Sequence, residues 1–172
     1  MAMNSIPTKD QIKIVPKVML HDHLDGGLRP QTIIDIAQEI GYTALPTHDA
    51  AELATWFREA CDSGSLVRYL ETFSHTIAVM QRKEDIVRVA RECALDLARD
   101  GVVYAEVRGA PELFTEKGLS MADVVEATLE GYELGMKEAK AEGFTIVVRS
   151  LLCGMRQNKK SLLKTSVIIY EA

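Results

Sequence analysis

Two histidines, His21 and His23, are the residues of this sequence whose types and spacing most directly indicate chemistry. They end a short apolar run, and Gly26 and Gly27 follow almost at once. On a β-strand, residues i and i+2 point to the same face, with α-carbons roughly 6.6 Å apart. Two imidazoles at that separation can bind one metal ion, because Zn–N bonds are about 2.0–2.1 Å long. Asp22 would then point to the opposite face.

The spacing by itself is equally consistent with two polar residues that end a strand. The surroundings favour the metal site. A strand that ends in possible ligands and then turns sharply is typical of parallel α/β folds, which place their chemistry at the carboxyl ends of strands.

The segment 16–27 resembles the first motif of the adenosine deaminase family, within the metal-dependent amidohydrolase superfamily. That motif reads Pro-Lys-x-x-Leu-His-x-His-Leu-Asp-Gly, and the sequence contains every specified residue. The segments 102–111 and 151–156 also resemble the family and occur in its order. The resemblance extends from about residue 13 to residue 156 and implies the amino-terminal half of such an enzyme.

The resemblance implies a role for several residues. His21 and His23 would bind Zn²⁺, and Asp25 would hydrogen-bond the ribose of a purine nucleoside. Relatives that act on the free base tend to carry Glu at that position, so Asp25 favours a nucleoside; the alternative is an Asp that only forms a turn. Met155, after the third expected strand, would line the substrate pocket. The implied reaction is hydrolytic deamination of adenosine or deoxyadenosine to inosine or deoxyinosine by zinc-activated water.

The rest of the catalytic apparatus is not matched in the sequence. A catalytic zinc takes three protein ligands and a water, and the family's other ligands and its acid–base glutamate come from later strands. His48 and His75 could complete a metal site, but surface or core roles are favoured for both. We therefore expect no catalytic residue in this chain, weak or absent zinc binding, and no activity of the chain alone.

The hydrophobic pattern predicts an α/β fold: a partial (β/α)₈ TIM-type barrel with about three of the eight strands and a helical insertion after the first. The later strands are expected at 102–107 and 144–152. The expected helices begin at Pro30 and run through residues 30–40, 49–57, 65–77, 83–99 and 120–143, with another from about 161. Residues 1–12 are predicted to be a loose tail, and residues 13–172 the amino-terminal portion of one metallo-hydrolase barrel domain.

Several features have two interpretations. The stretch 157–172 departs from the family pattern and is either a variant helix or an end altered by truncation or a frameshift. Glu106 and Arg108 alternate on one strand, and a buried ion pair or hydrogen bonds are favoured over catalysis; Arg156 is interpreted in the same way. An apolar stripe on the helix 65–77 is either a wall of the base pocket or, the favoured interpretation, core; its residues are Leu66, Tyr69, Leu70 and Phe73.

Composition limits the partners. The 172 residues carry a net charge of −5 without a basic cluster, which argues against nucleic acid, and no apolar run is long enough to span a membrane. No signal peptide is indicated. The three widely spaced cysteines, Cys61, Cys93 and Cys153, indicate a reducing cytoplasm, and Cys93 lies on a core stripe.

Two other functions remain open: a related deaminase of another aminated purine or nucleoside, and a non-catalytic truncated protein that acts by association. Self-association is expected because a three-strand arc has open edges. The strands 102–107 and 144–152 are interpreted as apolar on both faces, so one apolar face would remain in water.

Overall fold

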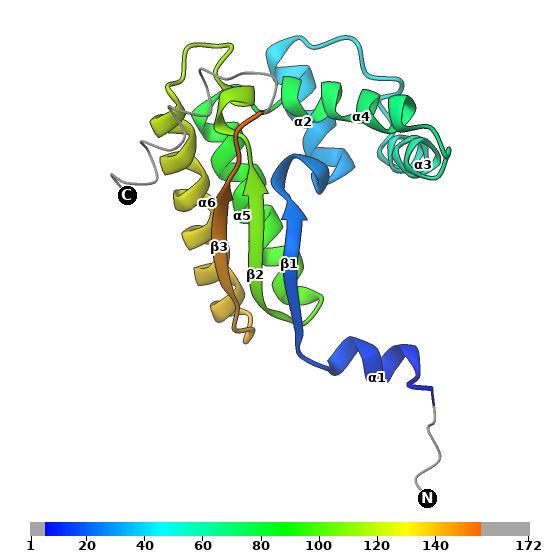
Figure 1. Ribbon diagram of the computed structural model, residues 1–172, viewed down its shortest axis with the longest axis vertical. Helices are drawn as coiled ribbons and strands as arrows, with labels where there is room; N and C mark the ends of the chain where they lie inside the picture. The colour runs from blue at the N-terminus through cyan, green and yellow to red at the C-terminus, as the bar shows by residue number, and fades with distance from the viewer. Residues whose placement is uncertain (1–5, 156–172) are drawn as a thin grey trace, which may run out of the picture.

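A parallel three-stranded sheet forms the centre of the computed structural model, which describes residues 6–155 (Figure 1). The strands β1 (Lys17–His23), β2 (Val102–Gly109) and β3 (Val147–Leu152) lie side by side in chain order. The predicted α/β fold and partial barrel are confirmed. Arg156, the stretch 157–172 and the expected helix from 161 lie outside the described residues.

Helices fill both connections between the strands. The α-helices are α1 (Lys9–Ile14), α2 (Pro30–Ile40), α3 (Ala50–Cys61), α4 (Leu66–Ala78), α5 (Lys83–Arg99) and α6 (Met121–Ala141). Two short 3₁₀ turns, η1 (Leu24–Gly26) and η2 (Pro111–Phe114), directly follow β1 and β2. None of the helices within residues 6–155 is long and apolar enough to cross a membrane.

The helix boundaries follow from capping residues. The Ser120 side chain accepts from the Asp123 amide while the Asp123 carboxylate accepts from the Ser120 amide, which forms a capping box at the start of α6. Pro30 occupies the first turn of α2, and Gly41 ends that helix at φ 69°, a left-handed conformation that glycine adopts without strain.

One face of the sheet packs against α5 and α6. Ala105 and Val107 of β2 are completely buried in the core that these helices complete. Gly131 and Gly135 of α6 let the two helices approach very closely, because a Cβ added at Gly135 would lie 2.4 Å from the Arg91 carbonyl oxygen. The close contact of α5 and α6 therefore depends on these two glycines.

The opposite face of β2 carries polar residues, which corrects the expectation of a strand that is apolar on both faces. Tyr104, Glu106 and Arg108 alternate with the buried Ala105 and Val107 and are only partly buried. The Tyr104 hydroxyl donates to Glu106 Oε1 at 2.9 Å. The side chains of β2 therefore divide into an apolar face toward the helices and a polar face toward the barrel interior.

The three helices α2, α3 and α4 form the insertion predicted after the first strand. Figure 1 shows them gathered beyond the carboxyl end of β1. Near the amino terminus, the short helix α1 begins within the stretch 1–12 that is predicted to be a loose tail. A capping box between Thr8 and Gln11 begins this helix at Lys9, although none of its residues is buried. The helix forms from local signals, without packing against the core.

Candidate metal and nucleoside site

The two histidines at the end of β1 lie close together. The ring centroids of His21 and His23 are 5.5 Å apart, with the ring planes at 40°. Two imidazoles on one tetrahedral zinc ion would have ring centres roughly 5 Å apart, given Zn–N bonds of about 2.0–2.1 Å. The observed pair is therefore spaced as two ligands of one ion require, and both side chains are exposed to whatever approaches this sheet end.

A β-bulge lies within this motif, between Met19 and Asp22. Met19 is level with Ala105 and Asp22 with Val107, so β1 has one more residue than β2 between these two pairs. A bulge re-aims the side chains next to it. His23 is level with Arg108, on the polar face of the sheet, whereas Asp22 is level with the buried Val107.

Among residues 6–155, no third His, Cys, Asp or Glu side chain completes a metal-binding group with His21 and His23. No other group of three such side chains occurs there either. His75 belongs to a different cluster: its Nδ1 is 2.9 Å from the Tyr42 hydroxyl, and its ring lies edge-on to Trp56. Burial lowers the pKa of His75, as expected for an imidazole that remains neutral inside a helical layer. His48 is exposed in the loop before α3.

Asp25 is the buried carboxylate of the site. It lies on η1, is 7% exposed, and its Oδ1 has no hydrogen-bond partner among the described residues. The His23 imidazole lies beside it, but its Nδ1 is 3.7 Å from Oδ1, which is too long for a hydrogen bond. Burial raises the pKa of Asp25 above its usual value. A buried acceptor without a partner is what a hydroxyl of a ligand could satisfy.

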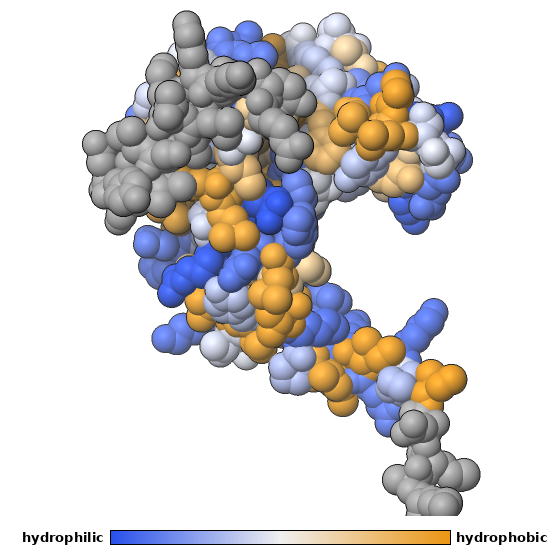
Figure 2. Space-filling model, in the orientation of Figure 1, coloured by the Kyte–Doolittle hydropathy of each residue, from blue (hydrophilic) through white to orange (hydrophobic). Residues whose placement is uncertain are grey.

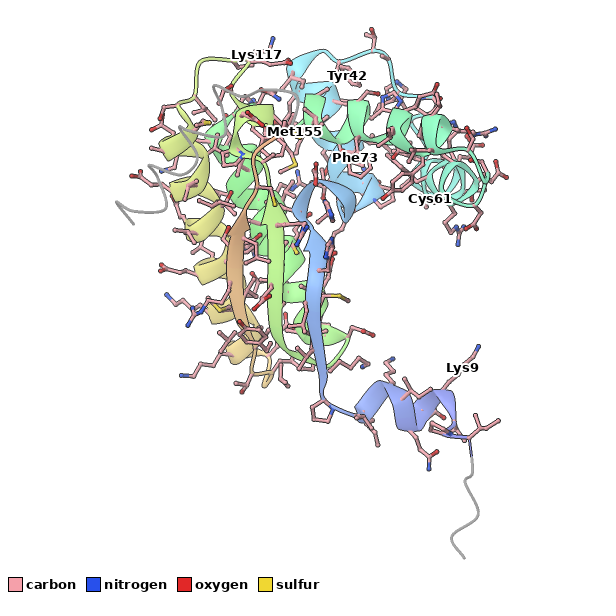
Figure 3. All side chains as sticks on the ribbon, in the orientation of Figure 1. Lys9, Tyr42, Cys61, Phe73, Lys117 and Met155 are labelled. Atoms are coloured by element: carbon pink, nitrogen blue, oxygen red, sulfur yellow. The ribbon has the colours of Figure 1, made fainter. Side chains whose placement is uncertain are left out.

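A cavity of about 330 Å³ opens beside Asp25, between η1 and the helical insertion. Its walls are mainly apolar and aromatic, a composition typical of small-molecule sites, and include Ile33, Phe57, Cys61, Tyr69 and Phe73. Figure 3 shows Phe73 and Cys61 on the helices that enclose it.

The stripe on α4 is not core, which corrects the favoured interpretation. Leu66 is 70% and Leu70 54% exposed, whereas Tyr69 and Phe73 line the cavity with their rings 5.4 Å apart. Sequence reasoning did not identify Phe57 of α3, which lines the same cavity. The one signal that could have found it is its helical spacing after Leu53, which is buried.

Met155 follows β3 and is 37% exposed. Its backbone N–H donates to the Glu112 carboxylate of η2. Met155 is not among the residues that line the cavity beside Asp25, so the structure does not bring these two predicted substrate residues together in one cavity.

The polar residues of β2 are paired only in part. Glu106 accepts the hydrogen bond from Tyr104, as expected for a charge on a barrel strand, but no ion pair joins it to Arg108 among the described residues. The Arg108 Nε is buried without a partner there, one strand away from His23. Cys93 is partly buried and packs against the core, and its burial raises the pKa of its thiol to about 12.

Comparison with known proteins gives one consistent result. The family model described as "Adenosine deaminase" matches residues 16–170. Adenosine deaminase 1 of Streptomyces coelicolor is 58% identical over 161 residues, which are 94% of this chain and 41% of the relative. The adenosine deaminase of Mycobacterium tuberculosis is 56% identical over 154 residues, 90% of this chain and 42% of the relative. The chain thus spans about two fifths of the length of these relatives.

Solved structures agree on the fold. Arabidopsis ADAL in complex with GMP has a TM-score of 0.76 at 25% identity. The match covers 94% of this chain and 47% of that protein. An amidohydrolase from Burkholderia ambifaria with bound Zn has a TM-score of 0.76 at 23% identity; the match covers 99% of this chain and 45% of that protein. The partial barrel therefore corresponds to slightly less than half of each complete structure.

Proposed function

This chain belongs to the adenosine deaminase family, and we propose from that premise that it supplies the amino-terminal part of an enzyme that hydrolytically deaminates adenosine and deoxyadenosine. The observation that carries the proposal is the His21–His23 pair with the buried Asp25 beside it. The pair would bind the metal, and Asp25 would orient the sugar of the nucleoside.

The donor set fits zinc. Neutral imidazole is a preferred zinc ligand, and the 5.5 Å ring separation leaves both rings able to reach one ion. When bound, zinc supplies a water that is activated at neutral pH, because the metal lowers the pKa of that water to about 7. His21 and His23 hold two of its coordination positions. Two ligands form an incomplete site, so binding to this chain alone is weak.

Asp25 and the cavity would select the substrate. The partnerless Oδ1 is placed to accept a hydrogen bond from a ribose hydroxyl, and the aromatic side chains Tyr69 and Phe73 would exclude water around the sugar and base. A phosphate at this carboxylate would be repelled, which favours nucleosides over the nucleotides named in the Arabidopsis complexes with GMP and IMP. Met155 would approach the substrate from the end of β3, outside the cavity itself.

We propose that the remaining metal ligands and the acid–base group come from the part of a complete relative that this chain does not cover. To test this, residues 1–155 would replace the corresponding part of the Streptomyces coelicolor enzyme. The chimera is expected to convert adenosine to inosine, followed by the loss of adenosine absorbance. The 172-residue chain alone is expected to give no turnover.

Adenine and AMP, measured beside adenosine, test the substrate assignment. Adenosine is expected to be the best of the three, because only a nucleoside offers Asp25 a sugar hydroxyl without bringing a phosphate. A folded chimera that prefers adenine or AMP would favour the related-deaminase alternative. Turnover by the chain alone that is lost in His21→Ala would show that the missing groups are in this chain.

We also propose self-association through the edge strands. Val18 and Leu20 of β1 are each 58% exposed, and Figure 2 shows a hydrophobic area over this strand. Exposed edges pair readily with other strands. Sedimentation is expected to show dimers or larger species, and Leu20→Lys is expected to reduce them. A monomer at high concentration that binds no dye for apolar surface would contradict this proposal.

We propose a cytoplasmic location. Cys61, Cys93 and Cys153 are all free thiols, and Cys61 is exposed. Free thiols persist most readily in a reducing compartment.

A further inference from the structure

We propose that Asp22 is a positioning residue, whose carboxylate holds the backbone at the carboxyl end of the bulge and so keeps His21 and His23 in their present orientation. The inference rests on the proposed metal site and adds a residue to it. Asp22 itself would not bind the metal, because it is level with the buried Val107 on the helix side of the sheet.

The direct support is a hydrogen bond within the motif. The His23 backbone N–H donates to Asp22 Oδ1 at an N···O distance of 2.9 Å. This bond lies at the end of the bulge, where the register of β1 against β2 shifts between Met19 and Asp22. A bulge disrupts the ladder, so a backbone amide there gains from a side-chain acceptor.

The Asp22 carboxylate is close enough to groups on α5 and α6 to affect their pKa values. Burial raises the pKa of the Cys93 thiol on α5 and of the Tyr132 hydroxyl on α6, and the negative charge of Asp22 raises both further. The Tyr132 hydroxyl is buried without a partner among the described residues. Asp22 therefore lies level with the buried Val107 on the helix side of the sheet, while the neighbouring His21 and His23 are exposed.

The bulge determines which way the histidines point. Side chains alternate along a strand, so a change of register by one residue turns each side chain to the other face. If the hydrogen bond to His23 is lost, regular pairing with β2 competes with the bulge. His21 and His23 would then turn away from their present face of the sheet, although neither residue has changed.

The test compares Asp22→Ala, which removes the acceptor, with Asp22→Asn, which keeps an Oδ1 acceptor but removes the charge. Asp62→Ala is the control, because Asp62 is an exposed carboxylate at the end of α3. Two properties of the native 172-residue chain and each variant are measured: the proton shift of the His23 amide without metal, and the response of the His21 and His23 ring signals to added Zn²⁺.

The Asp22→Ala chain is expected to show an upfield shift of the His23 amide proton and a Zn²⁺ affinity about 10- to 100-fold lower, the range for residues that orient metal ligands. The Zn²⁺ affinities of Asp22→Asn and of the control are expected to stay within about threefold of the native affinity, a change well below that range. Circular dichroism verifies that each variant is folded.

Two results would overturn the inference: a His23 amide unchanged in Asp22→Ala, or an Asp22→Asn variant as impaired as Asp22→Ala, which would assign the effect to charge. Failure of the metal site gives a different result. If the chimera described above and its His21→Ala, His23→Ala double variant hold equal amounts of Zn²⁺, the proposed metal site is wrong. The amide shift then still decides whether Asp22 holds the bulge.

Discussion

Replacing His21 with alanine is expected to lower kcat/KM for adenosine more than about 100-fold in the chimera described above, beyond the range for residues that only orient metal ligands. The reason is that the pair supplies two of the ligands of the proposed zinc ion, with rings 5.5 Å apart. Steady-state rates and the zinc content of the purified protein are to be measured together, and both are expected to fall.

His48→Ala is the matched control, because His48 is an exposed histidine in the loop before α3 and belongs to no cluster of metal-binding side chains among the described residues. It is expected to leave both the rate and the zinc content unchanged. A His21→Ala chimera that keeps more than a tenth of the native rate would show that this imidazole is not a ligand.

Gly135→Ala is expected to lower the free energy of unfolding of the chain by about 1–3 kcal/mol, the usual cost of overpacking. The added Cβ would lie 2.4 Å from the Arg91 carbonyl oxygen and 2.7 Å from the Ala94 Cβ, both on α5. Neither the backbone nor a Cβ can rotate away, so the two helices must move apart. Urea denaturation measures the change.

The sign of this effect separates packing from helix propensity. In a helix without such a neighbour, Gly→Ala stabilises by about 1 kcal/mol. Glu133→Ala, on the exposed face of the same helix, is the control and is expected to change stability by less than about 0.5 kcal/mol. An unchanged or increased stability of Gly135→Ala would show that α5 and α6 are not in the close contact described.

Both predictions depend on features that the fold places side by side. The proposed metal site lies at the carboxyl end of β1, and the contact of α5 with α6 supports the sheet from behind. The polar face of β2, with Tyr104 and Glu106 hydrogen-bonded to each other, lies on the side where the rest of a barrel would close. The described part of the chain thus resembles a barrel wall more than a self-sufficient domain.

Local signals in the sequence were sufficient for most of the secondary structure. The run before His21 predicted β1, Pro30 and Gly41 delimited α2, and Ser120 began α6. These predictions succeeded because capping, left-handed glycine and hydrophobic periodicity act within a few residues. The short helix α1 was missed, although its capping box at Thr8 and Gln11 is a signal of the same local kind.

Contacts between distant segments decided the rest. Simple alternation placed His21 and His23 on one face, but the bulge that arranges them arises from pairing with β2, about 80 residues later. The apolar stripe of α4 suggested core, yet Tyr69 and Phe73 line a cavity because α3 packs opposite them. Similarly, Glu106 pairs with Tyr104 on its own strand, and Arg108 finds no partner among the described residues.

The burial of Asp25 shows most clearly how tertiary packing differs from local sequence signals. The sequence indicated an aspartate next to two glycines, a composition equally typical of a simple turn. Only the packing of the insertion over η1 buries that carboxylate and leaves Oδ1 without a partner. Residue type and spacing therefore determined which polar groups lie near the carboxyl end of β1. The tertiary structure decided which of them are desolvated and face one another, because burial depends on segments that no local pattern encodes.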